Sequence, residues 1–430
     1  MLNSRFLVLI SLSSVLLFSC ENEDTEPPSV EITSPSESAQ FQVYDTIPVY
    51  YHVSDDRIVE SVTIKLVNQD FVPVSGQQTK TIGAADFSGF EALVVDNRQL
   101  PTGTYYVLIT ATDGTNDKNA YLEVRVQEFP FALRAIYFGD ANSSGQNSIF
   151  RIDSLFNSVT PFVSIGQDVR KLSVNSMFDR LNIAGNLDGG IVQYNLAGQG
   201  IRWSASASMQ PPAPTFLDMT SAAGNVYVSL YNNEIRGYTN DGALILNLQT
   251  FGDRPNTLYA DENHLFVERR QIGGILNTLF VYRVSNFFQK WELSLPMQVV
   301  AFCARTATEL FIFGNENGQA RVLLYNVEDN SYWEPRALPL GKLLHAVKGD
   351  GQTYFLAHEN GLYSYTYNPN YLNQIGSGDV YQQLCFDRAD GLLLGASGNE
   401  VRVIAGLQGA VVATFAHSDS IVSLDIHYTK

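Results

Sequence analysis

The chain has 430 residues, of which 45% are hydrophobic and 17% are charged, and its formal net charge at pH 7 is −17. This composition is that of a globular protein with a sizeable core, and the length leaves room for two or three domains. The acid excess argues against nucleic acid as a partner and against flat docking on an anionic membrane surface.

The N-terminal segment has the layout of a secretory signal. Arg5 supplies a positive charge, and the apolar stretch from Phe6 to Phe18 that follows is too short to span a bilayer. The stretch ends in Leu17-Phe-Ser-Cys20, which resembles the bacterial lipobox. The resemblance implies a lipoprotein signal peptide over residues 1–19, cleavage before Cys20, and attachment of acyl chains such as palmitate to Cys20. Several acyl chains anchor a protein stably, where a single chain is marginal.

Residues 20–27 are acidic and poor in apolar side chains, so we expect them to form a flexible tether. The run Glu21–Glu26 also resembles the surface-export signal of lipoproteins from the Bacteroidetes. This resemblance implies an outer-membrane lipoprotein that faces outward. A solvated linker explains the same residues, so a periplasm-facing orientation stays open. The lipid is the one membrane contact that the sequence predicts.

The pattern over residues 28–128 predicts short strands of alternating polarity with turn residues between them. Strands at this spacing over about a hundred residues favour a β-sandwich. The segment has no tryptophan and no cysteine pair, which excludes an antibody-type domain. We expect strands over residues 29–33, 47–53, 59–66, 90–94, 103–112 and 121–126.

The last third of this segment carries a family resemblance. Leu100–Tyr106 followed by Ala111–Gly114 resembles Ig-like and cadherin-like modules of bacterial surface proteins. In cadherin-like modules Asp113, Asn116 and Asp117 would be candidate calcium ligands. We favour a hydrogen-bonded turn here, because Asp, Gly and Asn are the residue types that turns require.

Residues 129–430 contain an internal repeat. Each repeat opens with an apolar triplet, and successive triplets start about 38–45 residues apart, which is within the range for β-propeller blades. We predict seven four-stranded blades, with the last triplet, in Ile421–His427, pairing beside Ala135–Phe138 to close the ring. The triplets begin at Leu172, Leu217, Leu258, Phe302, Leu344, Leu384 and Leu424.

Three tryptophans stand at one position of their repeats, where the fourth strand is expected to begin: Trp203, Trp291 and Trp333. We interpret them as packing between neighbouring blades rather than stacking on sugars. The run Val192–Trp203 resembles a degraded quinoprotein-type propeller repeat. The family's Ala-x-Asp-x-x-x-Gly core and its quinone-binding cysteines have no counterpart here. The resemblance therefore implies architecture alone, and we predict no cofactor.

The sequence has no Gly-x-Ser-x-Gly, His-Glu-x-x-His, Cys-x-x-Cys or Gly-Lys-Ser/Thr motif. The second position of the first strands places Cys303, His345 and Cys385 in three consecutive repeats, a combination that could bind a soft metal. Equivalent positions in a ring all face the next blade, and the two cysteines stand too far apart for a disulfide. We favour buried packing and predict no metal site.

Candidate ligand-binding residues lie in the loops before the first strands, which we expect to open on the face around the central channel. Loops on a rigid scaffold commonly bind ligands, and a mixed basic and acidic funnel suits a polar ligand. The alternative interpretation is that each of these residues, taken singly, is part of a solvent-exposed turn. The candidates are Asp168, Arg170, Asp253, Arg254, Lys342, Asp379, Tyr381 and Asp419.

The sequence thus predicts an all-β protein in which an Ig-like β-sandwich (28–128) precedes a seven-bladed propeller (129–430). The leading hypothesis for function is a non-catalytic cell-envelope lipoprotein whose propeller binds or scaffolds a protein or glycan partner, with the Ig-like domain as a stalk. The alternative is an envelope enzyme, a lyase or a glycan hydrolase, with its site at the channel mouth. A purely structural spacer is a third hypothesis.

Overall fold

The computed structural model describes residues 25–141, 147–187, 190–207 and 214–430. The predicted signal peptide (1–19), the lipidation site Cys20 and residues 21–24 of the predicted tether lie outside the described residues.

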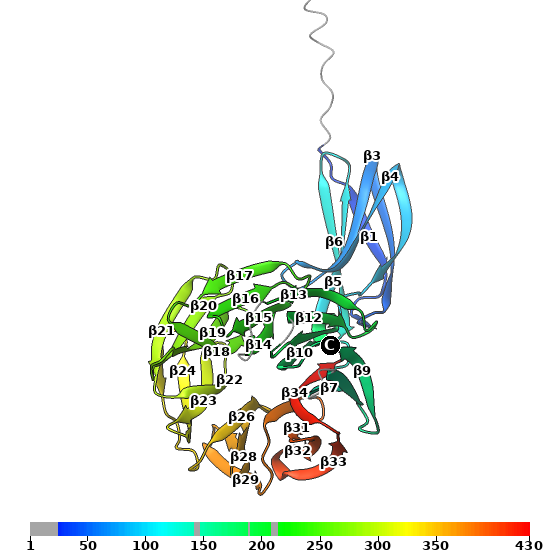
Figure 1. Cartoon of the computed structure of the whole chain (residues 1–430). Helices are drawn as coiled ribbons and strands as arrows, with labels where there is room; N and C mark the ends of the chain where they lie inside the picture. Colours follow the sequence, from blue (N-terminus) through cyan, green and yellow to red (C-terminus); the bar gives the residue numbers. More distant parts are fainter. Residues whose placement is uncertain (1–24, 142–146, 188–189, 208–213) are drawn as a thin grey trace, which may run out of the picture. The chain divides into compact units, whose positions relative to one another are not determined.

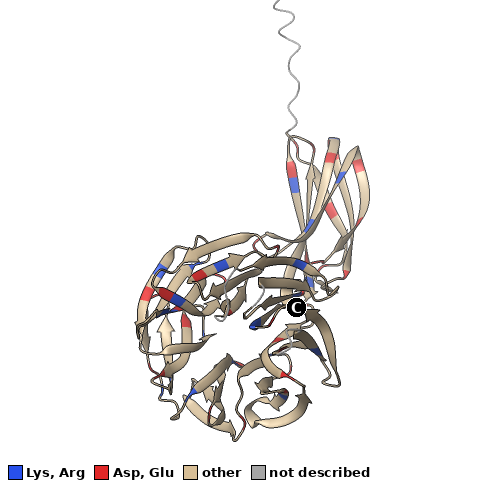
Figure 2. Ribbon diagram, viewed as in Figure 1, with Lys and Arg blue, Asp and Glu red and all other residues tan. Residues whose placement is uncertain are grey.

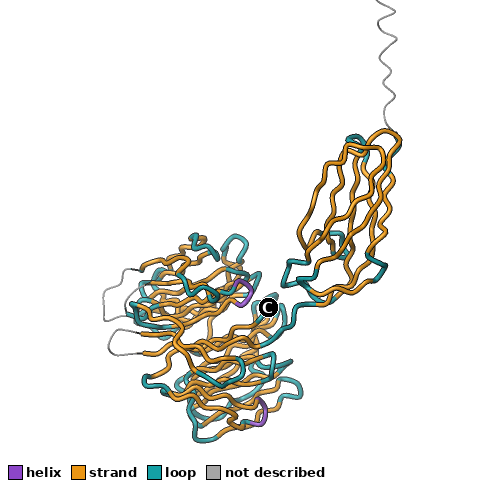
Figure 3. Tube along the Cα trace, turned by 90° about the vertical axis from the view of Figure 1, so that its right-hand side faces the viewer, coloured by secondary structure: helices purple, strands orange, loops and turns teal. Residues whose placement is uncertain are grey.

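The chain divides into two compact units, Met1–Pro130 and Phe131–Lys430 (Figure 1). Strands dominate both units, and the short helical turns η1 (Ser176–Phe178) and η2 (Gly406–Gln408) lie in the second unit (Figure 3). In the described parts of the chain, no helix is long and apolar enough to cross a bilayer.

Two long strands organise the first unit. β3 (Thr46–Val67) and β4 (Pro73–Val94) pair over most of their length, with register shifts in β3 between Ser54 and Val59. β1 (Ser29–Ser34) pairs with β3 before this irregularity, and β5 (Gly103–Thr112) pairs with β3 after it. β3 therefore contributes to both layers of the sandwich. β6 (Asp117–Gln127) and β2 (Ala39–Gln42) follow beyond β5.

The strand boundaries differ from the prediction at β3 and β4. The separate strands expected over residues 47–53 and 59–66 are joined in β3, and the short strand expected over residues 90–94 is the end of β4. The earlier part of β4 is exposed or half-buried at every position. Its hydrophobicity therefore does not alternate strongly enough to reveal the pleat.

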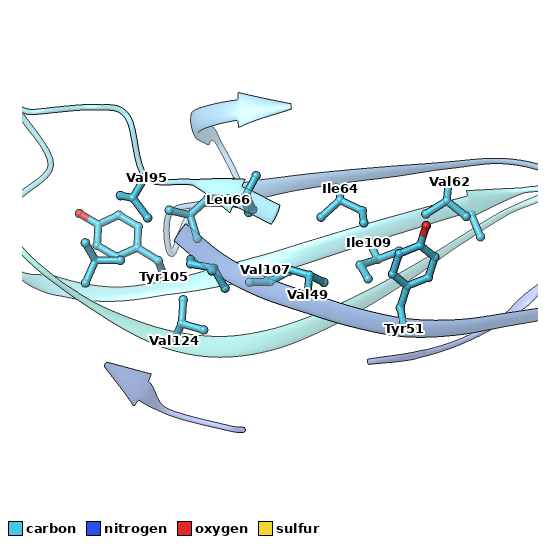
Figure 4. Close-up of a cluster of buried hydrophobic side chains, with 14 of the residues drawn as sticks. Val49, Tyr51, Val62, Ile64, Leu66, Val95, Tyr105, Val107, Ile109 and Val124 are labelled. Carbon is cyan, nitrogen blue, oxygen red and sulfur yellow. The ribbon is translucent and has the colours of Figure 1, made fainter. Parts of the chain in front are cut away.

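The core of the first unit lies between its two layers. Val49 and Tyr51 of β3 and Val107 and Ile109 of β5 are buried against one another, together with Ile64 (Figure 4). Complete burial of a valine or isoleucine side chain stabilises the fold by about 1.5–3 kcal/mol. All buried members of this cluster belong to the first unit, so this unit has a core of its own.

Asp113 closes the turn between β5 and β6. Its Oδ1 accepts hydrogen bonds from the backbone N–H groups of Thr115 and Asn116, both at 2.6 Å. The side-chain amide of Asn116 donates to Oδ2 at 3.1 Å. These hydrogen bonds, chiefly that from the Asn116 backbone, lower the pKa of the Asp113 carboxyl. The contacts of Asp113 are those of a side chain that stabilises a turn.

The second unit is a β-propeller. Among the described residues, seven antiparallel four-stranded sheets form a ring, and the first strands of neighbouring sheets contact one another around its centre (Figure 1). We number the sheets as blades 1 to 7 in the order in which their first strands occur in the chain.

Blade 1 consists of β10 (Lys171–Asn175), β11 (Arg180–Ala184), β12 (Gly190–Asn195) and β13 (Ile201–Ser206). Blade 2 consists of β14 (Phe216–Ala222), β15 (Asn225–Leu230), β16 (Glu234–Tyr238) and β17 (Leu244–Gln249). Blade 3 consists of β18 (Asp253–Ala260), β19 (His264–Gln271), β20 (Asn277–Arg283) and β21 (Gln289–Leu295). Blade 4 consists of β22 (Gln298–Ala304), β23 (Glu309–Glu316), β24 (Gln319–Asn326) and β25 (Ser331–Trp333).

Blade 5 consists of β26 (Leu343–Lys348), β27 (Thr353–His358), β28 (Gly361–Thr366) and β29 (Tyr371–Gly376). Blade 6 consists of β30 (Gln383–Asp387), β31 (Leu392–Ser397), β32 (Glu400–Ala405) and β33 (Ala410–Ala416). Blade 7 consists of β34 (Ser420–Tyr428), β7 (Leu133–Ala141), β8 (Asn147–Asp153) and β9 (Val159–Ile165).

Blade 7 closes the ring with strands from both ends of the second unit. β34 pairs antiparallel with β7, with Leu424 opposite Phe138 and Ile426 opposite Ile136 (Figure 1). The Tyr428 ring stacks on Phe131, with ring centroids 4.5 Å apart. The pairing removes the open strand edges that an unclosed ring would expose. The predicted fold class, an Ig-like β-sandwich followed by a closed seven-bladed propeller, is confirmed.

The three tryptophans do not share one environment. Trp203 and Trp291 donate their indole N–H groups to backbone carbonyls of the next blade, those of Asn240 at 3.1 Å and Val327 at 2.7 Å. Trp333 is 47% exposed, because its strand β25 ends at this residue, two positions before Pro335. The interpretation of inter-blade packing agrees with the contacts of the first two tryptophans. Trp333 is more exposed, but it also borders the next blade, where it lines a surface cavity with Tyr367 and Pro369.

Candidate binding site

Antiparallel strands place the loops of each blade alternately at two faces of the ring. One face carries the loops that link each blade to the next and the loops between second and third strands; we call it the linker face. The opposite face carries the loops between first and second strands and between third and fourth strands. All eight predicted ligand-binding residues lie in, or directly beside, inter-blade loops of the linker face. Figure 2 shows acidic and basic residues interspersed around the ring.

Asp168 and Arg170 lie together in the loop that precedes blade 1. The Asp168 carboxylate accepts hydrogen bonds from the backbone N–H groups of Asn186 at 2.7 Å and Leu187 at 2.6 Å. It therefore holds the loop between the second and third strands of its own blade. The Arg170 side chain is exposed and donates a long hydrogen bond, 3.4 Å, to the carbonyl of Leu217 in blade 2.

Asp253, Arg254 and Lys342 occupy two other blades. The Arg254 guanidinium carbon lies 3.7 Å from the ring centroid of Tyr231 in blade 2, which is a cation–π contact. The Nε atom of Arg254 is buried and has no hydrogen-bond partner among the residues that the structure describes. Asp253 is half-buried, and its carbonyl accepts a hydrogen bond from the Thr250 hydroxyl at 2.7 Å. Lys342 is exposed before blade 5.

Asp379 and Tyr381 share a single guanidinium, that of Arg402 in the same blade. Asp379 pairs with Arg402 at 2.6 Å, and the Tyr381 hydroxyl also hydrogen-bonds Arg402. These hydrogen bonds raise the pKa of Arg402, and the bond to Asp379 has the largest effect. The buried Tyr381 ring lies directly on Gly395, where a Cβ atom would be 2.4 Å from it, so glycine is required there. Tyr381 thus packs on β31 and holds its loop in place.

Asp419 lies in the loop before β34. Its carboxylate accepts a hydrogen bond from the Ser418 hydroxyl at 2.8 Å and stands close to His417 and Asp140. The structure therefore brings Asp379 and Tyr381 together and distributes the other predicted residues over several blades of the linker face.

An apolar cluster on the linker face was missed by the sequence analysis. Two loops of blade 3, one before β18 and one between β19 and β20, carry Phe251, Ile272, Ile275 and Leu276, which are 86%, 48%, 93% and 59% exposed. We call these four residues the blade-3 tip. Ile275 and Phe251 are the two most exposed large hydrophobic residues in the described part of the chain.

One backbone hydrogen bond joins the two loops of the blade-3 tip: the N–H of Ile272 donates to the carbonyl of Gly252 at 3.1 Å. A second, from the N–H of Gln271 to the carbonyl of Leu276 at 3.0 Å, closes the loop between β19 and β20. The run Ile272-Gly-Gly-Ile-Leu276 does not indicate exposure in the sequence, because apolar residues are expected to be buried.

Side chains of the first strands connect neighbouring blades at the centre of the ring. Four such side chains hydrogen-bond the backbone of the next blade. Two aspartates and a histidine accept a hydrogen bond from a backbone N–H group, and a cysteine thiol donates one to a backbone carbonyl. The pairs are Asp425 with Val174 at 2.7 Å, Asp218 with Leu258 at 2.7 Å, His345 with Leu384 at 3.3 Å, and Cys385 with Leu424 at 3.2 Å.

Burial decides the protonation of these groups. It raises the pKa of Asp425 to about 6, lowers that of His345 to about 4, and raises that of the Cys385 thiol. Cys303 is buried in an apolar cluster with Phe311, and both cysteines are free thiols. Cys303, His345 and Cys385 therefore contribute to separate blade interfaces, as expected from their register.

The opposite face holds a cavity of about 420 Å³ at the mouth of the channel. Its wall includes Asn175, Ser221, Arg388 and Asp425, which come from four different blades. None of the eight residues predicted to bind a ligand lines this cavity, because all eight lie on the linker face. The residues that line this cavity lie at the ends of the first strands. That these ends meet at one mouth is evident only from the folded ring.

Comparison with known proteins supports the two-part architecture. The profile of the family described as "Bacterial Ig domain" matches residues 28–111. The first unit contains a bacterial Ig domain. No curated protein matches the chain.

Solved structures resemble this chain at low sequence identity. A protein from Lactobacillus plantarum is 16% identical, with a TM-score of 0.54, over 68% of this chain and 99% of its own. A functionally unknown protein from Desulfotomaculum acetoxidans is 11% identical, with a TM-score of 0.53, over 68% of this chain and 99% of its own.

A third likeness extends over nearly the whole chain. A quinonprotein alcohol dehydrogenase-like protein from Bacteroides thetaiotaomicron is 10% identical, with a TM-score of 0.51. The match covers 95% of this chain and 100% of that protein. At such identities the likenesses concern the fold, a β-propeller, and not the activity.

Proposed function

We propose that this protein is a non-catalytic cell-envelope lipoprotein, anchored through acyl chains on Cys20, whose propeller binds a protein partner through the linker face. The tether and the Ig-like unit act as a stalk. The observation that carries the proposal is the blade-3 tip, where two loops joined by a backbone hydrogen bond carry four exposed large apolar side chains. Apolar groups clustered at the surface of a folded protein mark interaction sites.

The chemistry of the tip favours a protein over a glycan. Glycan recognition uses aromatic faces together with fixed polar groups, whereas Ile272, Ile275 and Leu276 are aliphatic. Protein interfaces combine a desolvated apolar centre with a polar rim. The exposed Arg170 and Lys342 lie on the same face and would contribute to such a rim by steering charged partners.

Two groups at the channel centre, His345 and Cys385, are poorly suited to catalysis. His345 is a poor general base at neutral pH, because its Nδ1 accepts a backbone hydrogen bond and burial lowers its pKa to about 4. Cys385 is a poor nucleophile, because burial raises the pKa of its thiol and the thiolate is the reactive form.

The lipobox-like end of the signal and the acidic run Glu21–Glu26 support an outer-membrane lipoprotein that faces outward. Protease treatment of intact cells tests this orientation. We expect digestion without lysis, and we expect Cys20→Ala to release the protein from the membrane fraction. Protection until lysis would place the protein in the periplasm and contradict the surface orientation.

The binding proposal is tested by photo-crosslinking on cells of the source organism. A photoreactive residue at position 275 is expected to give a discrete protein adduct, and Phe251→Asp in the same chain is expected to abolish that adduct. Position 155 is the matched control, because Leu155 is 76% exposed on the opposite face.

Three outcomes contradict the proposal: no adduct at position 275, the same adduct at position 155, or an adduct that is insensitive to Phe251→Asp. Specific binding to purified envelope glycans that Phe251→Asp leaves unchanged would favour the glycan alternative instead.

A further inference from the structure

Three side chains with metal-binding chemistry meet where the propeller closes. Asp140 lies near the end of β7, and His417 and Asp419 lie in the loop between β33 and β34. One potential ligand atom from each residue lies within 4.8 Å of the other two. We propose that these residues bind a divalent transition-metal ion, with Zn²⁺ as the test case, and that the ion fastens the closing blade of the ring.

His417 is held in place from both sides. Its backbone N–H donates to the carbonyl of Asn399 at 2.8 Å, and the Asn399 side-chain amide donates to the His417 carbonyl at 2.7 Å. The imidazole packs against Phe150 and Phe138, with ring centroids 4.3 Å and 5.6 Å apart. These contacts direct Nε2 of His417 to Oδ2 of Asp140 at 3.1 Å.

Asp140 is oriented in the same way. Its side chain is 4% exposed, and its Oδ1 accepts a hydrogen bond from the backbone N–H of Ser148 at 2.9 Å. A hydrogen bond to one carboxylate oxygen orients the other oxygen for metal binding before the metal arrives. Two ligand atoms bound to one ion at about 2.1 Å stand roughly 3.0–3.4 Å apart. The spacing between Nε2 of His417 and Oδ2 of Asp140 fits this range.

The charge of the cluster favours a cation. Asp140 and Asp419 bring two carboxylates to one imidazole, and among the described residues neither forms an ion pair with a lysine or arginine. Asp140 contacts the backbone N–H of Ser148 and the imidazole of His417, and a metal ion would bring to this buried carboxylate a full positive charge that no lysine or arginine of the described residues supplies. One imidazole nitrogen with two carboxylate oxygens suits Zn²⁺ or Mn²⁺ better than Ca²⁺, which prefers oxygen ligands alone.

The position of the cluster gives the ion a structural role. His417 and Asp419 directly precede β34, and Asp140 stands opposite Ile421 in the ladder between β34 and β7. An ion bound here links the last strand of the chain to the first strand of the second unit. This role is independent of any partner that the linker face binds.

The test uses the full-length lipidated protein, purified in detergent without a histidine tag. After dialysis against Zn²⁺, bound metal is counted by mass spectrometry, and thermal unfolding is followed with and without Zn²⁺. We expect one Zn²⁺ per chain and a rise of about 5 °C or more in the propeller transition at saturating metal. Asp419→Asn and His417→Gln should each lower the affinity at least about 10-fold.

Asp261→Asn is the matched control. Asp261 stands 3.6 Å from Nδ1 of His264 on the opposite face, so it forms a carboxylate–imidazole pair, and among the described residues no third ligand joins it. This variant should bind Zn²⁺ like the unaltered protein. The proposal is overturned if the unaltered protein binds no Zn²⁺, or if binding is equal in Asp419→Asn. Stabilisation by Ca²⁺ and not by Zn²⁺ would overturn the assignment to a transition metal.

Discussion

Single side chains hold the centre of the propeller together. The first strands of blades 2, 5, 6 and 7 carry a polar side chain or a thiol at one equivalent position, and each of these groups hydrogen-bonds the backbone of the next blade: Asp218, His345, Cys385 and Asp425. A hydrogen bond to a carboxylate contributes about 1.5–3 kcal/mol and one to a neutral imidazole or thiol about 0.5–1.5 kcal/mol, while leaving a buried backbone group unpaired costs about 1–3 kcal/mol. These residues are therefore determinants of inter-blade stability rather than free reactive groups.

Asp425→Asn is expected to remove one pH dependence of stability. Burial, partly offset by hydrogen bonds from Val174 and Ile426 and by Lys171, raises the pKa of Asp425 from 3.8 to about 6. Between these values the folded protein retains a proton that the unfolded chain has released, so stability falls as pH rises. The loss should reach about 3 kcal/mol, at 1.36 kcal/mol per pKa unit. Urea unfolding of both proteins from pH 4 to pH 7 measures this difference.

His345 provides an internal check, because its pKa is shifted in the other direction. Burial lowers it to about 4, so its contribution to stability is present above pH 6.5 and is lost as pH falls towards 4. His345→Gln should therefore change the pH slope with the opposite sign. A difference between the original protein and Asp425→Asn that stays constant from pH 4 to pH 7 would contradict the assignment.

The register of the first strands predicted which residues face the next blade, because that depends only on the repeat. The loop candidates behave differently. Asp168 and Tyr381 were chosen as ligand-binding residues, yet their contacts hold loops in place. Acidic, basic and aromatic residues serve both purposes in turns, so residue type alone does not separate them. Whether any candidate binds a ligand stays a prediction.

At the scale of elements, predictability depends on burial. The second strands of the blades, such as β15 and β27, are almost fully buried between neighbouring blades, so their apolar pattern is strong and recurs with the repeat. The fourth strands, such as β17 and β33, are largely exposed and have a weaker pattern. The arm of β4 before residue 90 is half-buried at best, and its pattern was too weak to indicate a strand. Trp333 shows the reverse error, because the repeat predicted a full fourth strand where β25 has three residues.

Deleting residues 420–430 is expected to open the ring. The deletion removes β34 and leaves the backbone of β7 without its partner, and an unpaired strand edge promotes association between chains. We expect the protein to form oligomers and to lose a single cooperative propeller transition. Light scattering after size-exclusion chromatography and thermal unfolding measure these two effects.

Ser423→Ala is the control for this deletion. The Ser423 hydroxyl accepts a hydrogen bond from the N–H of Leu172 at 3.0 Å, so the variant loses one contact of β34 and keeps the strand. A loss of about 1 kcal/mol without oligomers is expected. A monomeric, cooperatively folding deletion variant would show that β34 is not needed to close the ring.

For the whole molecule, the order of the two folded parts followed from a change in pattern near residue 128, from one set of short strands to a repeat. The profile match to the bacterial Ig domain and the likenesses to propellers agree with that order. The exposed blade-3 tip and the Asp140–His417–Asp419 cluster could not be predicted in this way. Both depend on loops of different strands or blades that meet only in the folded ring.

Separating the chain between residues 130 and 131 is expected to give two proteins that fold independently. The buried cluster of the first unit contains only residues of that unit, and the other buried clusters contain only residues of the propeller. A domain with its own core unfolds cooperatively on its own. Calorimetry of the intact chain should show two transitions, each within about 2 °C of that of the separate unit. A single merged transition, or a first unit that does not unfold cooperatively alone, would contradict this independence and with it the role of the Ig-like unit as a self-standing stalk.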